Sequence, residues 1–245
     1  MPDMTPPRQS PVALVTGASR GLGLALTRSL VLRGWSVVVD ARDGARLAAA
    51  VAGLSDPSAV TAVVGDVVDD AHRTDLAAAV RERGGLDLLV NNASVVGPSP
   101  LPPLAAHPLP DLLEVFEVNA LAPLALVQLV VADLEARAGR VVNVSSDAAV
   151  EAYAGWGAYG AAKAALDHAS RVLAVEHPSL RVFSFDPGDM DTELHRRADP
   201  TVDPSTLASP ESVVPALLRL VDDDLPGGRY VASALLRAGS TAVPA

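Results

Sequence analysis

The sequence has 245 residues, of which 49% are apolar, with a formal net charge of −10 and no cysteine. This length allows one large α/β domain or two small ones, and the negative charge argues against nucleic acid or an anionic membrane surface as the main partner. Without cysteine there are no disulfides, thiol nucleophiles or thiolate metal sites, which fits a cytoplasmic protein.

Residues 1–11 carry four prolines and lack an apolar core. We therefore expect a short disordered lead-in rather than a secretion signal, followed by one domain over residues 12–245. The longest apolar stretch, residues 120–132, is too short to span a membrane and contains Pro123 and Gln128. We expect a buried helix there and no membrane partner.

A strand, a glycine-rich turn and a helix are predicted at the start of the domain. The apolar run VALV at residues 12–15 is followed by TGASRGLG at residues 16–23 and by a helical pattern that stops at Gly34. Glycines let the backbone approach a pyrophosphate, and a helix start supplies free N–H groups. The spacing G-x-x-x-G-x-G differs from the G-x-G-x-x-G fingerprint, but the strand before it and the helix after it favour a cofactor site over a simple tight turn.

The second predicted strand, residues 37–39, ends at Asp40, with Arg42 two residues on. An acidic residue at this place can bind the ribose hydroxyls of NAD, whereas an arginine can bind the 2′-phosphate of NADP. Both are present, so the pattern leaves both cofactors open. Because Arg20 in the glycine loop adds a second positive charge nearby, we predict NADP and keep NAD as the alternative.

Further apolar runs alternate with helical patterns along the rest of the chain, which predicts a parallel sheet with right-handed crossovers. Ligands bind beyond the carboxyl ends of the strands in such sheets. The glycine loop, residues 40–42, Asp66 and residues 91–94 all fall at these ends. The later strands are expected at residues 60–64, 86–90, 140–144, 181–185 and 229–231.

Tyr159 and Lys163 lie four residues apart in a predicted helix. They would share one helix face, with Cβ atoms roughly 5–6 Å apart. A nearby ammonium favours the phenolate and lowers a phenol pKa from about 10, which would make Tyr159 a proton donor or acceptor near neutral pH. A solvated pair is the alternative when this motif is taken alone.

Asn119 interrupts the apolar stripe of a long helix predicted to open at Asp111. A polar group on an apolar helix face must find partners. Either Asn119 is a core residue bonded to backbone, or it holds a water molecule or orients a catalytic group.

These motifs together resemble the short-chain dehydrogenase/reductase family over about residues 12–231. The matching segments are TGASRGLG, Asp66-Val67, NNAS at 91–94, Asn119, Ser145-Ser146, YGAAK at 159–163 and PG-x-x-x-T at 187–192. The resemblance implies a single Rossmann-type, doubly wound parallel sheet of about seven strands with helices on both faces. It also implies a nicotinamide cofactor and assembly as a homodimer or homotetramer.

The resemblance assigns catalytic roles to four residues. Tyr159 would be the acid in reduction and the base in oxidation, and Lys163 would lower its pKa and hold the nicotinamide ribose. Ser146, thirteen residues before Tyr159, would bind the substrate oxygen. Asn119 would anchor a water molecule in a proton relay.

The resemblance also implies a set of cofactor contacts in the glycine loop, near adenine, near the adenosine ribose and on the nicotinamide side. These are Gly17, Ser19, Arg20, Gly21, Leu22, Gly23, Asp40, Arg42, Asp66, Val67, Asn91, Asn92, Ala93, Tyr159, Lys163, Pro187, Gly188, Met190 and Thr192. We predict no metal site, because the five histidines lack ligand spacing and are interpreted as surface or loop residues: His72, His107, His168, His177 and His195.

The predicted activity is hydride transfer between NADP(H) and a small ketone or secondary alcohol, with reduction of the carbonyl favoured. Segments near residues 155–159, 173–178 and 187–192 are similar to the sepiapterin reductase and benzil reductase branch. The alternative is a catalytically silent NAD(P)-binding sensor of the same fold. Ser94 departs from the family's glycine, and the substrate pocket is expected to be mostly apolar through residues such as Val95, Val150, Trp156 and Met190.

Overall fold

The computed structural model describes residues 10–239, so most of the lead-in predicted for residues 1–11 lies outside the described residues. The described chain forms a seven-stranded sheet in the order β3-β2-β1-β4-β5-β6-β7, and every neighbouring pair is parallel. This confirms the predicted α/β class. The strands are β1 (Val12–Val15), β2 (Ser36–Ala41), β3 (Val60–Val64), β4 (Leu88–Asn91), β5 (Arg140–Val144), β6 (Arg181–Asp186) and β7 (Gly228–Val231).

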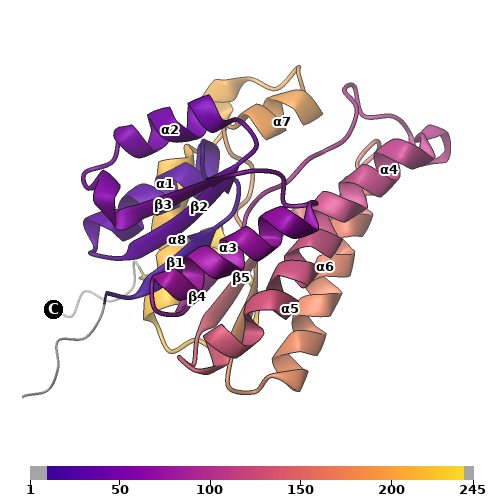
Figure 1. Ribbon diagram of the computed structural model, residues 1–245. Coiled ribbons are helices and arrows are strands. Elements are labelled where there is room, and N and C mark those ends of the chain that lie inside the picture. Colours follow the sequence, from indigo (N-terminus) through magenta and orange to yellow (C-terminus); the bar gives the residue numbers. More distant parts are fainter. Residues whose placement is uncertain (1–9, 240–245) are drawn as a thin grey trace, which may run out of the picture.

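The sheet has helices on both faces, because its central strands are buried on both sides. In β1, Ala13 and Val15 pack into one apolar core with helices α1 (Gly21–Leu32) and α8 (Pro210–Asp222). The alternate residues Val12 and Leu14 pack into a second core with α3 (Asp70–Glu82) and α5 (Ala122–Glu135). Figure 1 shows the two helical layers with the sheet between them.

The remaining helices lie around these layers, and several begin at a side-chain cap. The Asp43 carboxylate accepts from the Arg46 N–H at the start of α2 (Gly44–Ala52), and the Thr192 hydroxyl accepts from the His195 N–H in α7 (Glu193–Ala198). Neither α7 nor α9 (Ala232–Gly239) was expected from the sequence, because both are short. In Figure 1 the α7 helix lies beside α2, and an ion pair between Arg46 and Glu193 joins them.

One long continuous helix carries Asn119. It consists of α4 (Leu109–Phe116), the π-helical turn η3 (Glu117–Leu121) and α5. By length and composition its 27 residues are enough to cross a membrane, and the apolar stretch at residues 120–132 is only part of them. Half of its most apolar window is buried within the fold, as in a core helix.

The strand order reverses between β1 and β4, since β1 pairs with β2 on one side and with β4 on the other. In doubly wound sheets such a reversal opens a crevice at the carboxyl ends of the strands. The glycine loop leaves β1 at this point. On the other side of the crevice, α6 (Gly157–Glu176) follows β5 and carries Tyr159 and Lys163.

Candidate active site

A cavity of about 1180 Å³ opens at the carboxyl ends of the strands. Its wall contains Ser146, Tyr159 and Lys163 together with nearly all the cofactor contacts implied by the resemblance. The cofactor contacts Gly23 and Asn91 and the catalytic candidate Asn119 do not line the cavity. Segments far apart in the sequence therefore meet in one continuous space. The geometry agrees with the placement expected from strand ends.

The glycine loop is packed too tightly for side chains. A Cβ atom at Gly23 would lie 2.6 Å from Nδ2 of Asn92 and 2.7 Å from the carbonyl oxygen of Gly17. Gly17 itself has a φ of 68° and its Cβ would lie 2.9 Å from Cα of Ala93. The Asn92 amide donates to the carbonyl of Thr16 at 2.8 Å, which ties the loop to the end of β4.

The amino end of α1 faces this cavity through Gly21 and Leu22. Arg20 precedes the helix and makes no side-chain cap hydrogen bond. The first N–H groups of a helix lack partners within the helix and attract anions. An uncapped helix start on the wall of a large cavity therefore fits the pyrophosphate of a dinucleotide.

Asp40 has a role that the sequence pattern did not reveal. Its side chain is 1% exposed, Oδ1 accepts from the Gly17 N–H at 2.7 Å, and Oδ2 lies 3.0 Å from Nε2 of His72. Both oxygens of the Asp40 carboxylate are therefore bonded within the protein, one of them to the glycine loop. This geometry does not support the alternative that Asp40 binds the ribose hydroxyls of NAD. The interpretation of His72 as a surface or loop residue is wrong, since it lies buried on α3.

Three guanidinium groups stand at the rim where the adenosine half of a dinucleotide would enter. Arg42 pairs with Asp66 at 3.7 Å, and its side chain is 58% exposed. Arg20 and Arg46 both pair with the carboxylate of Glu193 on α7. Arg46 was not identified from the sequence, because only the fold brings α2 to this rim.

Tyr159 and Lys163 are both buried, which decides their proton chemistry. Burial raises the pKa of Tyr159 to about 12; hydrogen bonds with Ser94 and Ser146 act in the opposite direction. Burial also lowers the pKa of Lys163 to about 8. Its ammonium donates to the carbonyl of Val144 at 2.7 Å and lies 5.6 Å from the centre of the Tyr159 ring. The expected lowering of the Tyr159 pKa by Lys163 is wrong, because burial raises this pKa instead.

Ser146 follows β5 and begins the short helical turn Asp147–Ala149. Its hydroxyl donates to Oδ1 of Asp147 at 2.9 Å and accepts from the Ala148 N–H at 3.2 Å. The Tyr153 hydroxyl donates to the other oxygen of Asp147 at 2.9 Å. Asp147 and Tyr153 thus form a polar wall beside Ser146, where a mostly apolar lining was expected.

Asn119 lies in the π-helical turn and is 0% exposed. Its amide donates to the carbonyl of Val95 at 2.7 Å, and its oxygen accepts from the Val95 N–H and from the Ser94 hydroxyl. Of the two alternatives left open, a bond to backbone is therefore seen; the relay water stays a prediction. Ser94 links Asn119 to Tyr159. The sequence signal for this link was the serine at position 94, where the family has glycine.

The substrate side of the cavity is more polar than predicted. Val95, Trp156 and Met190 line it as expected, whereas Val150 is 61% exposed and lies outside it. Within residues 10–239, no three His, Asp or Glu side chains are grouped to hold a metal ion. Acidic and basic side chains of the segment after β6 complete the wall: Asp189, Asp191, Glu193, His195 and Asp199.

Comparison with known proteins decides the family. The model of the family described as short chain dehydrogenase matches residues 11–203. The chain belongs to the short-chain dehydrogenase/reductase family. It is therefore an oxidoreductase of that family, as its motifs predicted.

Relatives include both enzymes of the branch named from the sequence. Benzil reductase ((S)-benzoin forming) of Saccharomyces cerevisiae is 34% identical over 203 residues, covering 79% of this chain and 76% of that protein. Sepiapterin reductase of Mus musculus is 34% identical over 204 residues, covering 78% of each. A short chain dehydrogenase from Shigella flexneri complexed with NADP has a TM-score of 0.85 at 27% identity, covering 91% of this chain and 97% of that one.

Proposed function

We propose that this chain is an NADP(H)-dependent reductase of small ketones, with Tyr159 as the proton donor. The observation that carries the proposal is the position of Tyr159 and Ser146 on the wall of the cavity that begins at the glycine loop. A cofactor seated on that loop and a carbonyl beside Tyr159 would occupy one continuous space. When bound, the nicotinamide supplies the hydride that the carbonyl carbon accepts.

The proton chemistry favours the reducing direction. With a pKa raised to about 12, Tyr159 holds its proton throughout the neutral range. A protonated phenol can give a proton to the oxygen of a ketone as that oxygen gains negative charge. Oxidation of the alcohol needs the phenolate instead, so its rate should rise with pH well beyond neutrality.

Ser146 would polarise the substrate oxygen, for which its hydroxyl must turn from Asp147 toward the cavity. Lys163 would hold the ribose next to the nicotinamide, since its ammonium lies on the cavity wall behind Tyr159. Asn119 would anchor a relay water near Ser94 and thereby resupply the proton of Tyr159. The Asn119–Ser94 hydrogen bond supports a connection between these groups.

The preference for NADP rests on charge at the rim. Asp40 is occupied within the protein, whereas Arg20, Arg42 and Arg46 are about half exposed at the place where a 2′-phosphate would lie. Hydrogen bonds to a charged group are worth about 1.5–3 kcal/mol each. Similarity to the NADP complex from Shigella flexneri points the same way.

A homodimer or homotetramer is also proposed, through the long helix that carries Asn119 and the helix that carries Tyr159. Both helices carry exposed apolar side chains, which support the proposal: Leu113, Leu121, Leu129, Val172 and Val175. Large apolar side chains gathered at a surface mark contact sites between proteins.

The test is a panel of 1,2-diketones, simple ketones and pterin side-chain ketones, mixed with NADPH or NADH and followed by nicotinamide absorbance. We expect turnover with at least one ketone, and calorimetric binding of NADPH about tenfold or more tighter than NADH. Tighter binding of NADH would contradict the cofactor assignment. Binding of NADPH with no turnover on the whole panel would favour the sensor alternative.

A further inference from the structure

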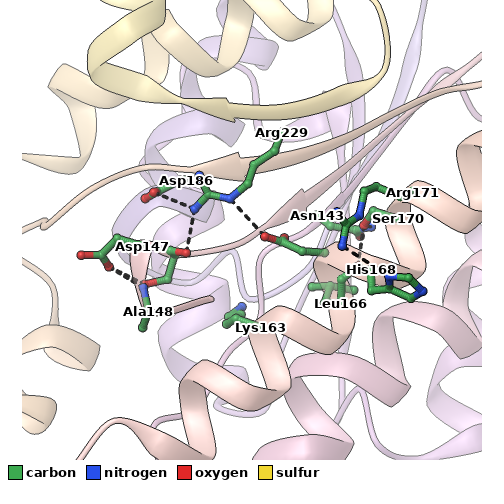
Figure 2. Close-up of polar contacts among 12 residues, drawn as sticks. Asn143, Asp147, Ala148, Lys163, Leu166, His168, Ser170, Arg171, Asp186 and Arg229 are labelled. Atoms are coloured by element: carbon green, nitrogen blue, oxygen red, sulfur yellow. Dashed lines mark hydrogen bonds and ion pairs between the residues drawn. The ribbon is translucent and has the colours of Figure 1, made fainter. Parts of the chain in front are cut away.

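Arg229, on the edge strand β7, reaches three acceptors on three different elements. Its Nε atom lies 3.1 Å from Oδ2 of Asp167 on α6. One terminal nitrogen donates both to Oδ2 of Asp186, at the end of β6, and to the main-chain oxygen of Ser146, at 3.0 and 2.9 Å. Figure 2 shows this guanidinium beside Asp186, with Asp147 and Lys163 nearby.

Each acceptor is connected to a group of the proposed active site. Ser146 is the residue proposed to polarise the substrate oxygen. The other oxygen of Asp186 accepts from the Gly188 N–H at 3.0 Å, and Gly188 lines the cavity on the proposed nicotinamide side. Asp167 stands one helical turn after Lys163, and its charge acts on that ammonium. A single side chain therefore ties the ends of β5 and β6 to α6.

The two carboxylates are buried and depend on Arg229. The side chains of Asp167 and Asp186 are 10% and 5% exposed, and that of Arg229 is 27% exposed. Removing one partner of a buried ion pair leaves an uncompensated charge in a poorly solvated place. Without Arg229, two negative charges would remain behind Lys163 and Tyr159. The Ser146 carbonyl would lose its side-chain donor and keep only the Ala149 N–H at 3.1 Å.

We propose that Arg229 is the positioning residue of the reductase site, holding Ser146 and the Asp186–Gly188 turn in place and balancing the carboxylates of Asp167 and Asp186. The proposal rests on the proposed function. Arg229 does not line the cavity and acts through other groups. This role was not visible in the sequence, because Arg229 lies 83 residues from Ser146 and reaches it only through the parallel pairing of β6 with β7.

The charged groups around Tyr159 decide the pH response. Lys163 lies on the same helix, Asp147 follows β5, Asp186 ends β6, and Arg229 comes from β7. The charges of Asp147 and Asp186 raise the pKa of Tyr159 beyond the larger effect of burial. Loss of Arg229 leaves Asp186 uncompensated, so the pKa of Tyr159 rises further and oxidation needs a still higher pH.

The test compares Arg229→Gln and Arg229→Lys with a matched control, Arg219→Gln. Arg219 also pairs with an aspartate at 2.7 Å and donates to a main-chain oxygen at 2.7 Å, and its side chain is 29% exposed. These contacts lie with Asp223 and Leu235, neither of which lines the cavity. Four quantities are measured for each protein: kcat and KM of ketone reduction, the pH profile of alcohol oxidation, NADPH affinity and Tm.

We expect Arg229→Gln to lower kcat about 10- to 100-fold, as misplacement of catalytic groups does. Its oxidation profile should move to higher pH, and its NADPH affinity should change less than kcat. Arg229→Lys should recover part of kcat, and Arg219→Gln should keep the wild-type kcat and pH profile.

Unchanged kcat and pH profile in a folded Arg229→Gln protein would overturn the proposal, as would equal loss of kcat in Arg219→Gln. If Arg229→Gln does not fold, Arg229→Lys decides alone. A lysine keeps the charge but cannot bind all three acceptors, so wild-type kcat in this variant would refute the positioning role. Absence of turnover by the wild-type protein on every ketone is a different result, which refutes the proposed function and the role of Arg229 with it.

Discussion

The two sides of the cavity are built in different ways. On the cofactor side, the glycine loop is held by buried contacts: Asp40 accepts from the Gly17 N–H, and Asn92 donates to Thr16. On the substrate side, the segment after β6 packs Leu194 and Ala198 into a small apolar cluster, but exposed ion pairs join it to the cofactor side. Glu193, which joins α7 to Arg20 and Arg46, is half exposed.

This difference has energetic consequences. Exposed ion pairs contribute about 0–1 kcal/mol each, whereas a buried polar group left without its partner costs about 1–3 kcal/mol. The cofactor side should therefore be rigid and intolerant of change. The α7 segment should open at low cost, which suits a wall that must admit both cofactor and substrate.

Within this comparison of the two sides, the largest effect on cofactor binding is expected at Gly23. The change Gly23→Ala puts a Cβ atom 2.6 Å from Asn92 Nδ2 and 2.7 Å from the Gly17 oxygen, so the loop must shift. Overpacking of this kind costs about 1–3 kcal/mol, which corresponds to a loss of about 5- to 150-fold in NADPH affinity by calorimetry.

The matched control for this change is Gly53→Ala, at the end of α2. Its Cβ would meet only main-chain oxygens at 3.6 Å, an ordinary contact distance. NADPH affinity should stay at the wild-type value there. Equal affinity in both variants would contradict the rigidity assigned to the cofactor side.

An effect of similar size is expected on the free energy of unfolding at Lys163. Because burial lowers its folded-state pKa to about 8 from 10.5, the ammonium destabilises the fold at pH 7. Lys163→Met should raise the free energy of unfolding there by about 1–3 kcal/mol while lowering turnover. Between pH 8 and 10 the unfolded chain binds more protons than the folded one, so the wild type gains stability and the difference shrinks.

Denaturant titrations at pH 7 and pH 10 measure this difference. The stability difference between variant and wild type at the two pH values serves as an internal control, because the contribution of methionine packing does not depend on pH. A Met variant that is less stable than the wild type at pH 7, or a gap that widens toward pH 10, would disprove the cost assigned to the buried ammonium.

The smallest effect is expected at Glu193. The change Glu193→Gln removes exposed ion pairs to Arg20 and Arg46, so the free energy of unfolding should change by less than about 1 kcal/mol. NADPH should bind up to about fivefold more tightly, because both guanidinium groups become free for its phosphates. Asp222→Asn is the control, since Asp222 forms an exposed ion pair with Arg33 at 2.7 Å and neither residue lines the cavity. Weaker NADPH binding in Glu193→Gln would show that Glu193 supports the site rather than competes for it.

The cofactor side was largely predictable from the sequence, and the contrast above explains why. Strands of consecutive apolar residues and a glycine-rich turn are local patterns, and parallel pairing then brings the strand ends to one edge. The seven-stranded sheet was predicted in this way. The inward turn of Asp40 was not, because its partner His72 lies 32 residues further along the chain.

The substrate side was much less predictable. Helix α7 has only six residues, too few for a helical period to stand out, and its contacts with Arg20 and Arg46 span long stretches of sequence. The pKa direction of Tyr159 was missed for a related reason. The pair Tyr159–Lys163 is visible in the sequence, but the burial that outweighs it arises only from packing around the whole helix.

The central claim is that Tyr159 gives the proton in carbonyl reduction, and the variant Tyr159→Phe tests it most directly. Calorimetry and circular dichroism establish that the variant folds and binds NADPH like the wild type, while absorbance measures ketone reduction. The account predicts unchanged NADPH affinity and a loss of turnover of about 10²–10⁴-fold. Turnover near the wild-type value in a folded, NADPH-binding Tyr159→Phe protein would contradict it.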